Sequence, residues 1–160
     1  MKNIIKILLL SLICMATKCE DKESENCHIS IRFSNNSEKD LYVRFYDLVH
    51  RPPNMSEIEH ISSTVRQRYK VYTGEQDNRE ATHQSSCIES YFRGQDTKTL
   101  YVFDAAIVEN TPWEVVAKDY LVLKRYDLTL EDLQRLDWRI TYPPTEAMKD
   151  IAQYPPYGSE

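Results

Sequence analysis

Apolar and polar residues alternate with a period of two in residues 28–33 (HISIRF) and 41–47 (LYVRFYD). Such alternation is typical of β-strands that bury one face. The turn-forming residues between them, 34–40 (SNNSEKD), predict that the two strands form a hairpin. Further strands are predicted at residues 68–73, 99–105, 119–126 and 138–142.

Two short helices carry recognisable start signals. Residues 111–114 (TPWE) place a capping threonine before a proline at the first helical position and a glutamate at the third, and they predict a helix to about Lys118. Residues 129–132 (TLED) form a capping box and predict a helix that ends near Leu136. Residues 145–151 predict a last short helix, and the proline-rich end after it is expected not to pair as a strand.

Six strands and two short helices predict an all-β fold, a single β-sandwich of the immunoglobulin or transthyretin kind over residues 27–144 with two helical inserts. Residues 145–160 then form a short helix and a tail. An α+β domain is the alternative, but the predicted helices look too short to cover a sheet. We expect Trp113 and Trp138 in the core, and the long polar segments 48–65 and 74–97 are candidate functional loops.

The N-terminus has the features of an export signal. Lys2 and Lys6 precede an apolar run over residues 7–16, which is too short to span a bilayer. Ordinary cleavage after Ala16 is one outcome. Residues 16–19 (ATKC) also resemble the end of a bacterial lipoprotein signal, although Lys18 departs from the small residue usual there. That resemblance implies a signal peptide over residues 1–18, a lipid on Cys19 and a charged tether over residues 19–26.

The acidic residues 20–23 (EDKE) resemble the surface-export signal of Bacteroidetes lipoproteins.

The cysteine count favours lipidation, because loss of Cys14 with the signal and a lipid on Cys19 leave Cys27 and Cys87 as a pair. A disulfide between them closes a loop of 60 residues. Cleavage after Ala16 leaves three thiols, an odd number for an oxidising compartment. The alternative role for Cys87 is a nucleophile paired with His83, four residues away.

The C-terminal half resembles a family of Bacteroidales lipoproteins whose function is unknown. The resemblance rests on residues 101–105 (YVFDA), on residues 109–151, which include TPWEVVAKDY and WRITYPP, and on residues 154–157 (YPPY). Residues 27–43 and Cys87 agree more loosely. The family implies location in the cell envelope and no known activity.

Charge and composition narrow the candidate partners. The formal charge is −5, and it becomes −8 when Lys2, Lys6 and Lys18 leave with the signal. Because the chain is acidic and has no basic run, its charge argues against nucleic acid as a partner. The three glycines cannot build a phosphate loop, and no Gly-x-Ser-x-Gly elbow occurs. The four histidines are scattered. We therefore predict no catalytic residue, no cofactor and no metal site.

The abundance of tyrosine is the remaining feature that points to a function, since the chain has eleven tyrosines. Tyr42, Tyr46 and Tyr72 fall opposite the more apolar faces of their strands, so an exposed stripe of rings could bind a glycan or an envelope protein. The alternative is a second sheet packed on that face.

We predict a surface-exposed, lipid-anchored outer-membrane protein that acts as a binding or structural module. The alternative is a glycan-directed hydrolase of the envelope, which needs two carboxylates that meet in a cleft.

Overall fold

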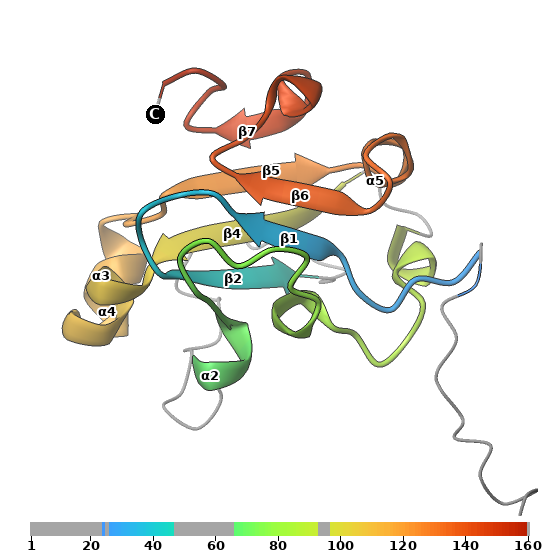
Figure 1. The fold of residues 1–160 in the computed structure, drawn as a ribbon. Helices are drawn as coiled ribbons and strands as arrows, with labels where there is room; N and C mark the ends of the chain where they lie inside the picture. The colour runs from blue at the N-terminus through green and yellow to red at the C-terminus, as the bar shows by residue number, and fades with distance from the viewer. Residues whose placement is uncertain (1–23, 25, 47–65, 93–96, 160) are drawn as a thin grey trace, which may run out of the picture.

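The computed structural model describes residues 24, 26–46, 66–92 and 97–159 (Figure 1). Its regular structure is mostly β-strand with a few short helices, which confirms the predicted β-rich fold. The strands are β1 (Arg32–Asn35), β2 (Leu41–Tyr46), β3 (Lys70–Val71), β4 (Lys98–Asp104), β5 (Lys124–Leu128), β6 (Arg139–Tyr142) and β7 (Ala152–Tyr154). The α-helices are α2 (Arg66–Tyr69), α3 (Ala105–Asn110), α4 (Trp113–Lys118) and α5 (Leu130–Arg135). Short 3₁₀ helices in the described residues are η3 (Glu80–Thr82), η4 (Ile88–Phe92) and η5 (Glu146–Met148).

The described strands form two sheets. Five of them make an antiparallel sheet in the order β3-β2-β4-β5-β7. The other two, β1 and β6, pair in parallel with Phe33 opposite Ile140. Figure 1 shows this parallel pair in front of the larger sheet, with α3 and α4 at the end where β2 begins and β4 finishes.

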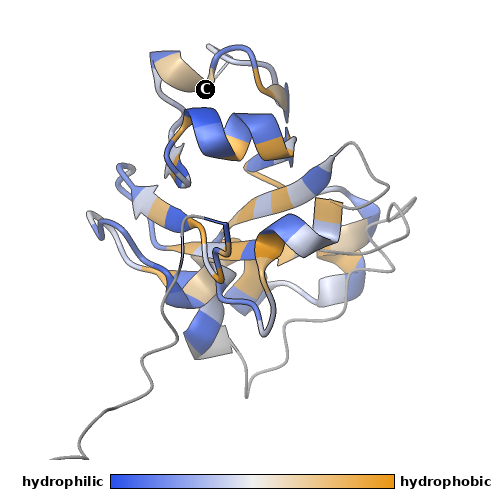
Figure 2. Ribbon diagram, turned by 90° about the vertical axis from the view of Figure 1, so that its right-hand side faces the viewer, coloured by the Kyte–Doolittle hydropathy of each residue, from blue (hydrophilic) through white to orange (hydrophobic). Residues whose placement is uncertain are grey.

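Apolar side chains gather on both faces of the five-stranded sheet. One cluster joins its β2, β4 and β5 side chains to Phe33 of β1, Ile140 of β6 and Leu133 of α5. The second cluster joins Tyr42 and Phe103 to α3 and α4. Figure 2 shows the apolar segments concentrated on the strands in the middle of the molecule. The predicted core positions of both tryptophans are confirmed, because each is almost fully buried.

The predicted hairpin between residues 28–33 and 41–47 is wrong. β2 pairs with β3 and β4, whereas β1 pairs with β6, more than a hundred residues away. The physical reason is that Ile31 and Phe33 pack onto the apolar face of the larger sheet instead of extending its edge. Alternation shows that a strand has one buried face, but it does not name the strand's neighbour.

Both predicted helices are present, with one corrected start. The capping box of α5 is confirmed, since the Thr129 side chain accepts from the Asp132 backbone and the Asp132 side chain accepts from the Thr129 backbone. α4 begins after Pro112, which occupies the N-cap without a side-chain hydrogen bond, and Thr111 instead ends α3. α3 itself was not predicted. The Asp104 carboxylate at the end of β4 accepts from Ala106 N at 2.9 Å and starts this helix within an apolar run.

Two predicted edge segments also differ. Residues 68–73 contain the end of α2 and a strand of only two residues, β3. The helix predicted over residues 145–151 is only the short 3₁₀ helix η5, and the segment after it does pair, because Tyr154 of β7 lies opposite Arg125 of β5. The strand stops before Pro155, whose carbonyl accepts a hydrogen bond at 2.7 Å from the ammonium of the fully buried Lys124.

Candidate functional site

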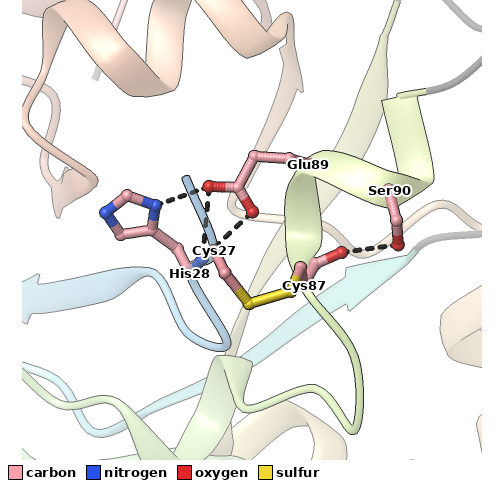
Figure 3. The surroundings of a disulfide bond; sticks show 5 residues. All are labelled: Cys27, His28, Cys87, Glu89 and Ser90. Atoms are coloured by element: carbon pink, nitrogen blue, oxygen red, sulfur yellow. Dashed lines mark hydrogen bonds and ion pairs between the residues drawn. A yellow bond between two sulfur atoms is a disulfide. The ribbon is translucent and has the colours of Figure 1, made fainter. Parts of the chain in front are cut away.

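Cys27 and Cys87 form the predicted disulfide, with their Cα atoms 4.8 Å apart (Figure 3). Cys87 is therefore not a free thiol, and the alternative of a nucleophile beside His83 is wrong for this structure. The bridge ties the segment before β1 to the start of η4. Two backbone hydrogen bonds of 2.7 Å accompany it, from Gln84 to Ile29 and from Ile88 to His28.

His28 and Glu89 form a close pair beside the disulfide (Figure 3). The imidazole Nδ1 lies 2.6 Å from a Glu89 carboxylate oxygen, and the same carboxylate accepts the His28 backbone N–H at 3.0 and 3.1 Å. The ring stacks on Trp138 with 3.9 Å between centroids. A carboxylate that orients an imidazole is two-thirds of a hydrolytic triad. The neighbouring Ser90 hydroxyl, however, donates to the Cys87 carbonyl. The His28–Glu89 pair therefore links the segment before β1 to η4.

A second group of side chains lies at the other end of the larger sheet, and we call it the Lys70 cluster. It consists of Asp40, Tyr42, Lys70, Tyr72 and Glu109. Register brings these residues together, because Lys70 of β3 lies opposite Tyr42 of β2, and α3 carries Glu109 back over the same strands. Tyr72 follows Lys70 by two residues, so the two side chains point to the same side of the extended chain.

Lys70 is the centre of this cluster. Its ammonium donates to Glu109 Oε1 at 3.0 Å and lies 3.4 Å from Asp40 Oδ2. The same ammonium is 6.0 Å from the ring centroid of Tyr42 and 5.6 Å from that of Tyr72, within range of cation–π attraction. Only 17% of the Lys70 side chain is exposed, so its position is set by these contacts.

The surrounding groups are held in place as well. The Tyr42 hydroxyl donates to Glu109 Oε1 at 2.9 Å, and Asp40 Oδ1 accepts from the backbone and the hydroxyl of Thr73 at 3.0 and 3.1 Å. The Tyr72 backbone N–H donates to Glu75 at 2.8 Å. These bonds fix the positions of two carboxylates around the Lys70 ammonium, which lies beside the exposed Tyr72 ring.

The charges of the cluster are stabilised in their ionised forms. The hydrogen bond with Glu109 raises the pKa of Lys70 above its usual range, against the opposing effect of burial. The backbone hydrogen bond from Thr73 lowers the pKa of Asp40. Outside the cluster, in the Lys39–Asp104 ion pair, burial acts to raise the pKa of Asp104, but hydrogen bonds from Lys39 and from the Ala106 N–H together lower it. Both aspartates thus stay ionised well below neutral pH.

The sequence-predicted tyrosines have three different outcomes. Tyr42 is only 2% exposed beneath α3 and α4, so it cannot belong to an exposed stripe. The helices fill the place that a second sheet was expected to take on that face. Tyr72 is 47% exposed and lies at the edge of the cluster. The side chain of Tyr46 lies outside the described residues.

Several other predictions also fall outside the described residues: the signal peptide 1–18, the lipidated Cys19, most of the tether 19–26 and the polar segment 48–65. In the described part of the chain, no three or more histidine, cysteine or acidic side chains are grouped so as to hold a metal ion. None of its helices combines the length and the apolar character needed to cross a bilayer.

Comparisons of the chain with models of protein families, with curated proteins and with solved structures found no match. The resemblance to Bacteroidales lipoproteins therefore stays a prediction from the residues quoted above.

Proposed function

We propose that this protein is a lipid-anchored binding module of the bacterial outer membrane, displayed at the cell surface. Three features support the proposal. The N-terminal residues have the pattern of a lipoprotein signal that ends at Cys19. The Cys27–Cys87 disulfide is typical of proteins that fold in an oxidising compartment outside the cytoplasm. The Lys70 cluster supplies an ordered, partly exposed group of polar and aromatic side chains.

The observation that carries the proposal is that the disulfide and the Lys70 cluster lie at opposite ends of the larger sheet. Register puts Leu41 and Asp104 at one end of the β2–β4 pair and Tyr46 and Thr99 at the other. Figure 1 shows the chain entering β1 at the end opposite α3, which carries Glu109. An anchor near Cys27 thus leaves the cluster directed away from the attachment point.

The short tether supports the same orientation of the domain relative to the membrane. Eight residues lead from Cys19 to Cys27, so a lipid on Cys19 holds the disulfide end within about 27 Å of the bilayer even if the tether is fully extended. The membrane-proximal end then carries the covalent bridge, and the membrane-distal end carries the candidate binding groups.

We also propose that the parallel β1–β6 pair and the five-stranded sheet act as the two layers of a small β-sandwich. The support is the apolar cluster that they share, which includes Phe33, Val102 and Ile140. In this view α3 and α4 are additions on the outer face of the larger layer.

The test of anchoring is incorporation of a labelled fatty acid in growing cells. Wild type should be labelled, and Cys19→Ser should be unlabelled and released into the soluble fraction. Equal labelling of the two proteins, or a mature N-terminus at Thr17, would contradict a lipid on Cys19.

Surface display is tested separately with protease added to whole cells. Wild type should be cleaved, and a variant with alanine at Glu20, Asp21 and Glu23 should stay lipidated but be protected. Unchanged cleavage of that variant means that the acidic residues are only a tether. Protection of both proteins means that the domain faces the periplasm.

A glycan-directed hydrolase is the second candidate, because Asp40 and Glu109 contact the same ammonium and so lie close together. Hydrolysis needs an acid with a raised pKa, whereas the Thr73 hydrogen bond lowers the pKa of Asp40. Glu109 would have to be that acid. Release of reducing ends that is lost in Glu109→Gln would establish the hydrolase. Binding of a glycan without release would exclude that glycan as a substrate.

A further inference from the structure

We propose that the Lys70 cluster is a carbohydrate-binding subsite that takes a neutral sugar, with the Tyr72 ring as its stacking platform. The inference rests on the proposed function as a binding module and names the class of ligand.

The balance of charge around the ring points to a neutral ligand. Three ionised groups lie close together there: the carboxylates of Asp40 and Glu109 and the ammonium of Lys70, which contacts both. The ammonium offsets one of the two carboxylates, so a polyanion meets two carboxylates and a polycation meets the ammonium. A sugar hydroxyl both donates and accepts, and it can therefore bond to either kind of group.

The Tyr72 ring supplies the apolar half of the subsite. It is 47% exposed, and the Lys70 ammonium lies 5.6 Å from its centroid. The C–H face of a pyranose is flat and apolar, and an exposed tyrosine offers a flat apolar area of similar size with a polar rim. The polar groups stand beside this platform, where they can reach the hydroxyls at the edge of a stacked sugar.

The groups are also fixed in advance, which lowers the entropic cost of binding. Lys70 is held by two carboxylates, Asp40 by two hydrogen bonds from Thr73, and Glu109 by the Tyr42 hydroxyl. A ligand therefore does not need to order long side chains by itself. A group of this size suits one or two sugar units, so we expect a weak site whose strength comes from repeated contacts along a polymer or among neighbouring molecules.

The experiment uses the full-length lipidated protein in detergent micelles and measures binding to three neutral probes: a soluble β-glucan, an α-mannan and chito-oligosaccharides. Heparin is the polyanionic control. We expect at least one neutral probe to bind and heparin not to compete. Tyr72→Ala should weaken that binding at least tenfold, whereas Tyr72→Phe should keep it within about threefold, because the ring is retained.

Tyr154→Ala is the matched control, since Tyr154 is 50% exposed on β7, at the opposite edge of the same sheet. It should leave binding unchanged. Thermal unfolding of each variant separates loss of the subsite from loss of the fold, and Lys70→Met with an intact fold should also weaken binding.

The inference is overturned if none of the neutral probes binds, if only heparin binds, or if Tyr154→Ala and not Tyr72→Ala abolishes binding. These outcomes leave fatty-acid labelling and surface cleavage untouched, so they refute the subsite without refuting the anchored module. Conversely, glycan binding by a protein that is not lipidated would refute the anchor alone.

Discussion

Replacing Cys27 and Cys87 together by serine should reduce the free energy of unfolding by about 2–4 kcal/mol. The bridge closes a loop of 60 residues. Cross-linking a loop of that length lowers the entropy of the unfolded chain by an amount worth about 4 kcal/mol at room temperature. That figure is the upper end of the expected loss, because non-covalent contacts along the same segment survive in the variant.

Those contacts also predict which part of the segment opens first in the variant. The early part of the segment is held independently, by paired backbone hydrogen bonds of 2.8 Å between Asn78 and Phe33 and by the buried Thr82 hydroxyl, which contacts the Ile31 backbone. The later part depends more on the bridge, although Ile88 is fully buried there. We therefore expect faster amide exchange at Gln84 and Ile88 before any change near Asn78.

Guanidinium unfolding followed by tryptophan fluorescence measures the free energy, and hydrogen exchange followed by NMR or mass spectrometry locates the opening. Ser86→Ala is the control, because Ser86 is an exposed neighbour of the bridge, and it should change stability by less than about 0.5 kcal/mol. A loss below about 1 kcal/mol in the double serine variant, or loosening that starts near Asn78, would refute the reasoning.

Three further changes have definite expected results. Thr129→Ala removes a formed capping box and should cost about 1 kcal/mol in guanidinium unfolding, whereas Thr111→Ala, which removes no helix N-cap, should cost less than about 0.5 kcal/mol. His28→Ala should cost about 1–2 kcal/mol and shift tryptophan emission, because it removes the ring stacked on Trp138 and its bond to a carboxylate. Folding lowers the pKa of Asp40 from its ordinary value of 3.8. The contribution of the Asp40 carboxylate to the free energy of unfolding is therefore present above that pH and is lost as the pH falls through the folded-state pKa. Asp40→Asn should therefore be less stable than wild type near neutral pH but lose less stability as the pH falls below 3.8, as measured by urea unfolding.

Local features of the fold were predictable because their causes are local. The alternation in residues 41–47 matches β2, and the TLED sequence matches the capping box of α5. Counting cysteines predicted the disulfide pair, on the hypothesis that Cys14 leaves with a signal peptide and Cys19 carries a lipid. Each of these inferences needed only neighbouring residues or a count.

Features that depend on distant parts of the chain were not predictable in this way. β1 and β6 are far apart in sequence, and nothing in residues 28–35 distinguishes a parallel partner from the nearby β2. The apolar run that begins at Leu100 continues into α3, and a short apolar run fits a strand or a helix equally well until the cap at Asp104 is seen. The pairing of His28 with Glu89 likewise spans 61 positions without a spacing motif.

The Lys70 cluster illustrates how the core determines the candidate site. Val71 is fully buried in the apolar cluster on one face of the larger sheet, so the residues on either side of it must point to the other face. That face receives Lys70 and Tyr72 beside Glu109 of α3. A slip of β3 by one residue would bury a lysine among apolar side chains and expose the valine, at a cost of several kcal/mol. The strand has only two residues, yet the burial of Val71 fixes its register, and the same register aligns the ammonium and the exposed ring.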